Sequence, residues 1–260
     1  MLQPVTDAGR AGLAALRADP ARALVAVDYD GTLAPVVQRP EDARPAPGAV
    51  EALHALAGTV GTLAVVTGRA ALVVLGLGGL DGVPGLVVLG QYGAERWDGA
   101  LVADPAAPGL DDLRTSIPPV LEGRARLEDK GLSLVVHGRG LPDPEAELAR
   151  LRPLLERLAA PYGLQVHPGR LVLEVRPAGH DKGRALRGLA DPAPSAVLFA
   201  GDDVGDLPAF DAVAALRAEG VPGLTVCSAS DEGPPALRER ADLVVDGPPG
   251  VVRLLEELAR

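Results

Sequence analysis

Cysteine is almost absent from this chain, since Cys227 is the single cysteine in 260 residues. One cysteine excludes an internal disulfide and a zinc site built from thiolates. The few histidines form no cluster along the chain, so a zinc site of imidazoles is not expected either. Cys227 ends the apolar run 224–227 and is expected to be a small core residue. This usage fits a reducing compartment, and we expect a cytoplasmic location.

Basic and aromatic residues are also scarce. Lys and Arg number 25 against 35 Asp and Glu, the net charge is −10, and aromatic residues make up 2% of the chain. A nucleic-acid interface needs a basic footprint, so a nucleic-acid partner is excluded. The core must be built from Ala, Val and Leu. An acidic protein that handles an anionic substrate needs local positive charge from a metal, a lysine or the start of a helix.

Long apolar runs are missing as well. No run approaches the roughly 18 residues that a membrane helix needs, so we expect no membrane span. The first residues, MLQPVTDAGR, lack the basic and then apolar order of a secretion signal. The sequence therefore predicts a soluble protein, and we take a monomer as the default expectation.

Short runs rich in valine and leucine recur along the chain without polar alternation. Continuous apolar runs of this length are typical of parallel strands buried on both faces. Helix-like segments at 48–57, 182–189 and 208–219 separate several of these runs. Alternating strands and helices predict an α/β fold with a doubly wound, Rossmann-like sheet. The predicted strands cover residues 24–27, 63–67, 86–89, 197–200, 224–226 and 243–245.

The middle of the chain has a different pattern. It predicts a proline-rich lead-in, two strands, a helix, and a hairpin around the turn Pro168-Gly169-Arg170. This order predicts a small α+β domain inserted into the α/β domain. We place the larger domain at residues 1–103 and 179–260, and the insert at 104–178. The predicted elements of the insert cover residues 104–119, 126–129, 132–137, 145–158, 164–167 and 171–176.

Two aspartates follow the first predicted strand, where Asp28 and Asp30 stand one residue apart before a Gly-Thr turn. Successive strand residues point to opposite faces, so both carboxylates are expected on one side and Tyr29 on the other. One carboxylate can then attack a phosphorus atom while the other handles the proton. Buried carboxylates that stay ionised so close together require a cation. The pair therefore predicts phosphoryl transfer on an aspartate.

Three further motifs fall at the ends of predicted strands or at the start of a helix, where open α/β sheets bind their ligands. Thr67-Gly68-Arg69 offers a hydroxyl and backbone N–H groups suited to phosphate oxygens. Lys182-Gly183 opens a helix, and its ammonium can neutralise charge on a transferring phosphoryl group. The acidic turn 201–206 is spaced for an oxygen-ligated cation such as Mg²⁺. Each motif alone is weakly diagnostic, whereas their joint occurrence in this order is informative.

In this order the four motifs resemble the haloacid-dehalogenase-like (HAD) phosphatases. That family carries Asp-x-Asp-Gly-Thr, then Ser or Thr, then Lys, then Gly-Asp-Asp-x-x-Asp, and this chain shows all four. The resemblance covers nearly the whole chain. It implies a Rossmann-like HAD catalytic core with an inserted α+β cap of the larger type, which contacts the substrate and closes over the site.

Finer motifs resemble the trehalose-6-phosphate phosphatase family, particularly its short bacterial members. Some positions depart from the commoner wording: Tyr92 stands where His is frequent, and Gly138 where Tyr or Thr is frequent. Gly205 and Leu207 stand where Thr and Glu are frequent. These departures leave the aspartates in place but loosen the assignment of the sugar. The motifs are GQYGAE at 90–95, LEDKG at 127–131, VHGR at 136–139 and GRLVLEVRP at 169–177.

The resemblance implies a magnesium-dependent mechanism through an aspartyl-phosphate. Asp28 would attack phosphorus, while Asp30 would protonate the leaving sugar oxygen and later deprotonate the attacking water. The carboxylates of Asp28 and Asp202 and the main-chain carbonyl of Asp30 would hold Mg²⁺. Asp203 or Asp206 would order the waters of the metal.

The resemblance also implies which residues contact the substrate. Arg69 is expected to brace the loop, with a substrate contact as the alternative. For Glu128 and Lys130, a surface ion pair is the alternative to a substrate role. The phosphoryl oxygens would be bound by Thr67, Gly68 and Lys182. The implied sugar contacts in the cap are Glu128, Lys130 and Glu174.

The leading interpretation is a phosphatase of trehalose 6-phosphate, a small-molecule sugar phosphate. Another sugar-phosphate phosphatase, of the sucrose 6-phosphate or mannosyl-phosphoglycerate type, is the alternative within the same chemistry. A non-catalytic sugar-phosphate sensor is the alternative from a different class, although a pure binder does not need the nucleophile. A phosphomutase would use the same nucleophile, but its usual smaller helical cap does not match the inserted α+β domain.

Overall fold

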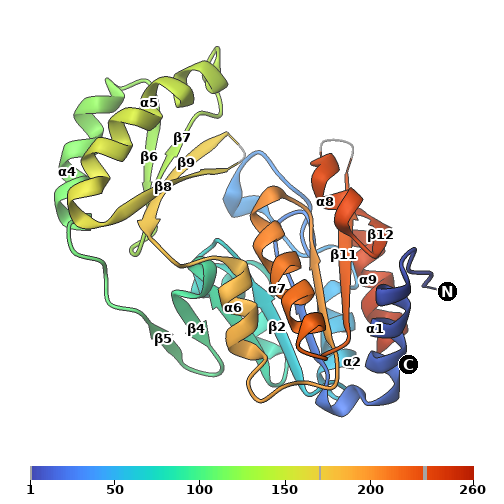
Figure 1. Ribbon diagram of the computed structural model, residues 1–260. Coiled ribbons are helices and arrows are strands. Elements are labelled where there is room, and N and C mark those ends of the chain that lie inside the picture. The colour runs from blue at the N-terminus through green and yellow to red at the C-terminus, as the bar shows by residue number, and fades with distance from the viewer. Residues whose placement is uncertain (1, 170, 231–232) are drawn as a thin grey trace. The chain divides into compact units, whose positions relative to one another are not determined.

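The computed structural model of the chain describes residues 2–169, 171–230 and 233–260. The chain forms two compact units (Figure 1), one made of the residues up to Val102 together with Asp181–Arg260, the other of Ala103–His180. The smaller unit is thus an insert in the sequence of the larger one. Within the described ranges, no helix combines the length and the apolar character that crossing a bilayer requires.

The larger unit is built around an eight-stranded sheet with the order β12-β11-β10-β1-β2-β3-β4-β5. Its strands are β1 Leu24–Val27, β2 Thr62–Val66, β3 Leu86–Gly90, β4 Glu95–Trp97, β5 Leu101–Ala103, β10 Val197–Gly201, β11 Gly223–Ala229 and β12 Leu243–Asp246. Neighbours from β12 to β3 are parallel, and β4 runs antiparallel to β3. The chain moves from β1 outward through β2 and β3, and later resumes on the other side of β1 with β10. The order therefore reverses between β1 and β10, which is where open α/β sheets bind ligands.

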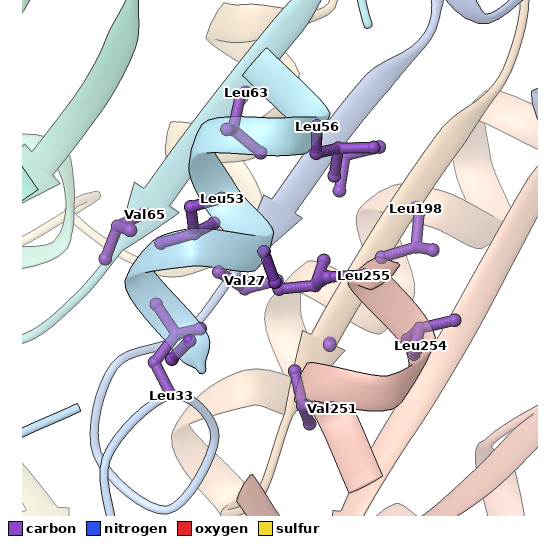
Figure 2. Packing of buried hydrophobic residues seen from close by; sticks show 14 of the residues in the cluster. Val27, Leu33, Leu53, Leu56, Leu63, Val65, Leu198, Val251, Leu254 and Leu255 are labelled. Atoms are coloured by element: carbon purple, nitrogen blue, oxygen red, sulfur yellow. The ribbon is translucent and has the colours of Figure 1, made fainter. Parts of the chain in front are cut away.

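Helices cover both faces of this sheet. Because side chains alternate along a strand, β1 directs Val25 and Val27 into one core cluster and Leu24 and Ala26 into another. The first cluster, part of which Figure 2 shows, includes side chains of α1, α2, α3 and α9, and the second includes side chains of α6, α7 and α8. This confirms the predicted doubly wound α/β fold. The helices are α1 Asp7–Ala18, α2 Ala49–Ala57, α3 Ala71–Gly78, α6 Lys182–Leu189, α7 Leu207–Ala218, α8 Pro235–Arg240 and α9 Gly247–Leu258.

The smaller unit has a four-stranded antiparallel sheet with the order β6-β7-β9-β8. Its elements are α4 Leu110–Leu121, β6 Arg126–Asp129, β7 Leu134–His137, α5 Pro144–Ala159, β8 Leu164–Gly169 and β9 Val172–Pro177. Both helices contribute to one core cluster with alternate residues of the strands. The turn predicted at 168–170 is described only in part: Pro168 and Gly169 belong to β8, and Arg170 lies outside the described residues.

One prediction for the smaller unit is wrong. The stretch 104–119 is more than a proline-rich lead-in, because α4 occupies its second half and contains Pro118 and Pro119. A proline inside a helix removes a hydrogen bond and crowds the preceding turn. An apolar stripe at helical spacing outweighs this penalty by packing into the core of the unit. The buried residues of the stripe are Leu110, Leu113, Ile117 and Leu121.

Candidate active site

Three buried aspartates meet at the carboxyl ends of β1 and β10, which are neighbours in the sheet. Asp28 follows β1, Asp202 follows β10, and Asp206 ends the short 3-10 helix η6 (Val204–Asp206). One oxygen from each of these carboxylates lies within 4.8 Å of the others, and all three side chains are buried. Oxygen ligands at this spacing suit a hard divalent cation. The structure thus brings the first and last predicted motifs together.

Two glycines let these carboxylates approach the backbone. Gly31 has a φ of +73°, and a Cβ atom there would overlap the carboxylate of Asp202. A Cβ atom on Gly201 would overlap the side chain of Asp206. Any larger residue at either position would therefore displace an aspartate of the cluster.

Lys182 places one ammonium among the three carboxylates. It is the first residue of α6, which begins at the N-cap Asp181, whose side chain accepts a hydrogen bond from the Arg184 N–H at 2.8 Å. The Nζ atom of Lys182 lies 2.8 Å from Oδ1 of Asp28 and 2.7 Å from Oδ1 of Asp206. Lys182 is 4% exposed, so solvent screens these ion pairs very little. The predicted Lys182 motif thus lies in contact with the Asp28 motif and with the acidic turn.

Asp206 also shapes the acidic turn. Its Oδ2 accepts hydrogen bonds from the N–H groups of Asp202, at 2.9 Å, and Asp203, at 3.1 Å. The Asp203 side chain in turn accepts from the N–H of Gly205 at 2.8 Å. Asp206 therefore fixes the turn that carries Asp202. Asp206 and Asp28 also contact the same ammonium, that of Lys182. This role goes beyond the ordering of metal-bound water that was expected of Asp206 or Asp203.

Burial is the main electrostatic influence on the cluster. It raises the pKa of Asp202 to about 8, and the Asp206 and Asp203 carboxylates add to the rise. The pKa of Asp28 is also raised well above its usual value by burial, against the opposing attraction of Lys182. Burial lowers the pKa of Lys182, but the Asp206 and Asp28 carboxylates outweigh it and raise that pKa. With all four groups ionised, three carboxylates share one ammonium, and two negative charges remain for a divalent cation to neutralise.

The side chain of Asp30 contacts Arg69. Nε of Arg69 donates to Oδ2 of Asp30 at 2.6 Å, and Nη2 donates to Oδ1 at 2.7 Å. The expectation that Arg69 braces a loop has support from its Nη1, which donates to the carbonyl of Pro40 at 2.8 Å. The contact with Asp30 was not predicted.

The phosphate-loop candidates Thr67 and Gly68 follow β2 and are held by a turn after β3. In this turn the N–H of Gln91 donates to the carbonyl of Arg69 at 2.8 Å, and the N–H of Tyr92 donates to the carbonyl of Thr67 at 2.9 Å. Gln91 and Tyr92 have φ values of +47° and +60°. Two consecutive left-handed residues other than glycine store strain, which is characteristic of functional sites. The strain therefore favours a positioning role for this turn.

Two further residues had no role assigned from the sequence, because their roles depend on tertiary contacts. Glu95 is buried and accepts from the N–H of Ala71 and from Nε2 of Gln91, both at 2.7 Å. Ser228, at the end of β11, donates its hydroxyl to the carbonyl of Gly31 at 2.6 Å. The GQYGAE motif marked Glu95 as notable, whereas nothing in the sequence marked Ser228.

In the smaller unit, the three predicted sugar-contacting residues each have a protein partner. Lys130 Nζ lies 3.4 Å from Oε1 of Glu174, which also accepts from the Ser133 hydroxyl at 2.6 Å. Oε2 of Glu128 lies 2.6 Å from Nε2 of His137. The hydrogen bond with His137 lowers the pKa of Glu128. Lys130 thus contacts Glu174, and its charge also lowers the pKa of Glu128.

A sequence model of the trehalose-phosphatase family matches residues 26–103 and 118–239. The trehalose-phosphate phosphatase of Mycobacterium leprae is 33% identical over 259 residues, with 90% of this chain and 56% of that protein covered. An uncharacterized glycosyl hydrolase of Mycobacterium tuberculosis is 36% identical over 209 residues, which cover 74% of this chain and 15% of that protein. This chain spans only part of the length of either relative.

Solved structures share the fold. The C-terminal domain of the C. albicans trehalose-6-phosphate phosphatase superposes with a TM-score of 0.79 at 20% identity, covering 99% of this chain and 98% of that one. The family match extends over both units and includes Asp28, Lys182 and Asp202. The chain belongs to the trehalose-phosphatase family.

Proposed function

We propose that this chain is a magnesium-dependent phosphatase that releases trehalose from trehalose 6-phosphate. The observation that carries the proposal is the cluster of Asp28, Asp202 and Asp206 around Lys182 at the reversal point of the sheet. Membership of the trehalose-phosphatase family supports the choice of substrate. The larger unit is then the catalytic core, and the smaller unit is the cap that determines specificity.

The proposed reaction has two steps. In the first, an oxygen of Asp28 attacks phosphorus, the bond from phosphorus to the sugar oxygen breaks, and Asp30 gives its proton to that oxygen. In the second, Asp30 takes a proton from water, the water oxygen attacks phosphorus, and the bond to Asp28 breaks to release phosphate. Thr67, Gly68 and Lys182 bind the phosphoryl oxygens and hold phosphorus in line with the nucleophile.

The donor set fits a divalent cation. The groups proposed to hold Mg²⁺ are the carboxylates of Asp28 and Asp202 and the main-chain carbonyl of Asp30, with Asp206 beside them. When bound, Mg²⁺ would offset the charge of the carboxylates and of the phosphoryl oxygens. Asp28 can then stay ionised, as a nucleophile must, although burial raises its pKa.

This electrostatic arrangement predicts an unusual pH dependence of stability. The pKa of Asp202 is about 8 in the folded protein against 3.8 ordinarily, so between these values only the folded state holds the proton. The contribution of Asp202 to the unfolding free energy without metal therefore falls as pH rises through this range. We expect Asp202→Asn to stabilise the metal-free protein at about pH 8 by about 1–3 kcal/mol, and to change it little at about pH 5.

Thermal unfolding with and without Mg²⁺ measures the pH dependence of stability and the stabilisation by the metal. Mg²⁺ should raise the melting temperature of the unaltered protein more at pH 8 than at pH 5, and should have little effect on Asp202→Asn. Asp211→Asn removes an exposed carboxylate and serves as the control. An Asp202→Asn protein that responds to Mg²⁺ like the unaltered one would contradict the proposed metal site.

The proposed sugar contacts lie on one face of the cap sheet. Glu128 and Glu174 are both register partners of Val135, so the three side chains point to the same side. The residues next to these in each strand, such as Val136 and Leu173, point to the other face and pack into the core with α4 and α5. Carboxylates and the ammonium of Lys130 on the opposite face can accept from and donate to sugar hydroxyls. We therefore propose this face as the sugar-binding surface.

Phosphate release from a panel of sugar phosphates tests the function. With Mg²⁺, we expect kcat/KM for trehalose 6-phosphate to exceed that for sucrose 6-phosphate, mannosyl-phosphoglycerate and glucose 6-phosphate by at least about 10²-fold. EDTA should abolish turnover, and Mg²⁺ should restore it. Comparable rates across the panel would point to a general sugar-phosphate phosphatase. Calorimetric binding of trehalose 6-phosphate without any turnover would point to a sensor.

A further inference from the structure

Arg69 holds both carboxylate oxygens of Asp30 at once. Its Nε and Nη2 atoms donate to Oδ2 and Oδ1 of Asp30 at 2.6 and 2.7 Å. Parallel pairing of β1 with β2 aligns Val27 with Val65, so the residues that follow the two strands lie side by side. A forked contact of this kind fixes the plane of a carboxylate as well as its position, which a single hydrogen bond does not.

Arg69 is itself fixed from several directions. Its Nη1 donates to the carbonyl of Pro40 at 2.8 Å, and its Cζ lies 5.8 Å from the ring centroid of Tyr29, within the range of a cation–π contact. Tyr29 is fully buried, and its hydroxyl donates to the carbonyl of Ala43 at 2.8 Å. The Arg69 carbonyl accepts from the N–H of Gln91. The guanidinium is therefore a rigid support.

Asp30 is less restrained by its surroundings than Arg69. Its side chain is 39% exposed, against 16% for the side chain of Arg69. The terminal torsion of an aspartate is broad, so an exposed carboxylate without such a contact samples many orientations. The Arg69 contact therefore supplies a constraint that burial does not.

We propose that Arg69 is a positioning residue that orients Asp30 for proton transfer in the phosphatase reaction. This inference rests on the proposed function, in which Asp30 serves as the acid and base. Proton transfer requires the carboxylate within hydrogen-bond reach of the reacting oxygen, and a misplaced group loses much of its effect. Arg69 acts on the rate through Asp30, without a contact of its own to the reacting atoms.

The leaving group provides the test. A sugar alkoxide needs a proton to leave, whereas p-nitrophenolate leaves as a stabilised anion, so only the sugar phosphate depends on Asp30 up to formation of the aspartyl-phosphate. We expect Arg69→Gln to lower kcat/KM for trehalose 6-phosphate by about 10–10²-fold and that for p-nitrophenyl phosphate by no more than about threefold. Arg69→Lys keeps the charge but loses the forked contact, so its kcat/KM for trehalose 6-phosphate should lie between those of the unaltered protein and Arg69→Gln.

A double-mutant cycle separates positioning from other roles. In an Asp30→Asn background, Arg69→Gln should cause no further loss on trehalose 6-phosphate in single-turnover measurements. The matched control is Arg44→Gln, because Arg44 is an exposed arginine that also contacts a backbone carbonyl, that of Glu41. Circular dichroism and melting temperatures confirm that each variant is folded.

Other outcomes would overturn the inference in distinguishable ways. Equal losses on both substrates that persist in Asp30→Asn would show that Arg69 braces the loop. A larger inhibition constant for inorganic phosphate in Arg69→Gln would show that Arg69 binds the phosphoryl group directly. An unaltered protein that turns over neither ester would overturn the proposed function, and the role of Arg69 with it.

Discussion

Replacing Asp28 by Asn is expected to lower phosphate release from trehalose 6-phosphate by about 10⁴–10⁶-fold, the scale of loss seen when a covalent nucleophile is removed. An amide oxygen carries no full negative charge and cannot form the acyl phosphate. Loss of the fold would not explain this result. Asn has nearly the shape of Asp, and its oxygen can still accept from Nζ of Lys182, which lies 2.8 Å from Asp28 in the native protein. The melting temperature of the metal-free variant should therefore equal or exceed that of the unaltered protein.

A covalent intermediate makes this prediction more specific. With p-nitrophenyl phosphate, whose leaving group needs no acid, an Asp30→Asn protein should form the aspartyl-phosphate but hydrolyse it slowly, because the base for water is missing. Acid quenching after mixing with phosphate-labelled substrate should then find label on Asp30→Asn and none on Asp28→Asn. Hydroxylamine should release the label, as it does from acyl phosphates. Label on the Asp28→Asn protein would identify another nucleophile and contradict the mechanism.

The larger unit could be predicted well because its signals are local. Four of the apolar residues that precede Asp28 form β1 over the predicted bounds, and the helix that begins at Lys182 also has its predicted bounds. A continuous apolar run followed by carboxylates has few interpretations other than a buried strand leading to a site. The neighbouring helices α1 and α9 were not assigned, although Thr6 caps α1 by accepting from the N–H of Gly9.

The contacts within the site could not be predicted in the same way. Arg69 and Asp30 are 39 residues apart, and Lys182 and Asp206 are 24 apart. The motifs identify which residues belong to a site, but the pairing of an individual donor with an individual acceptor depends on side-chain geometry. A Thr-Gly-Arg sequence after a strand is compatible with bracing, phosphate binding or positioning.

The helix α4 illustrates a conflict between two signals. Leu110, Leu113, Ile117 and Leu121 have helical spacing, which predicts a helix, whereas Pro118 and Pro119 argue against one. Burial of four large apolar side chains contributes about 1.5–3 kcal/mol each, so it exceeds the penalty of the prolines near the end of the helix. Whether this apolar stripe has a core to pack against depends on the tertiary structure, which the sequence of the helix does not show.

Lys182→Met is expected to combine a large loss of stability with a loss of activity. The side chains of Asp28 and Asp206 are 5% and 0% exposed, and both lie within 3 Å of the Lys182 ammonium. Methionine fills a similar volume but leaves two buried carboxylates without their counter-charge. Removing one partner of a buried ion pair typically costs about 3–5 kcal/mol, because the remaining charge is desolvated and unpaired. We therefore expect the melting temperature to fall by about 10 °C, whereas Arg22→Met, which removes an exposed partner of Asp19, should change it little.

The double variant Lys182→Met with Asp206→Asn shows whether the loss comes from this charge imbalance. Asn at position 206 removes one unpaired carboxylate and can still accept hydrogen bonds from the N–H groups of Asp202 and Asp203. Much of the stability should therefore return, as it does when both members of a buried pair are replaced. Phosphate release should stay low, since the ammonium that is proposed to bind the phosphoryl oxygens is still missing. A double variant that is less stable than Lys182→Met alone would show that Asp206 matters mainly as the organiser of its turn, independently of Lys182.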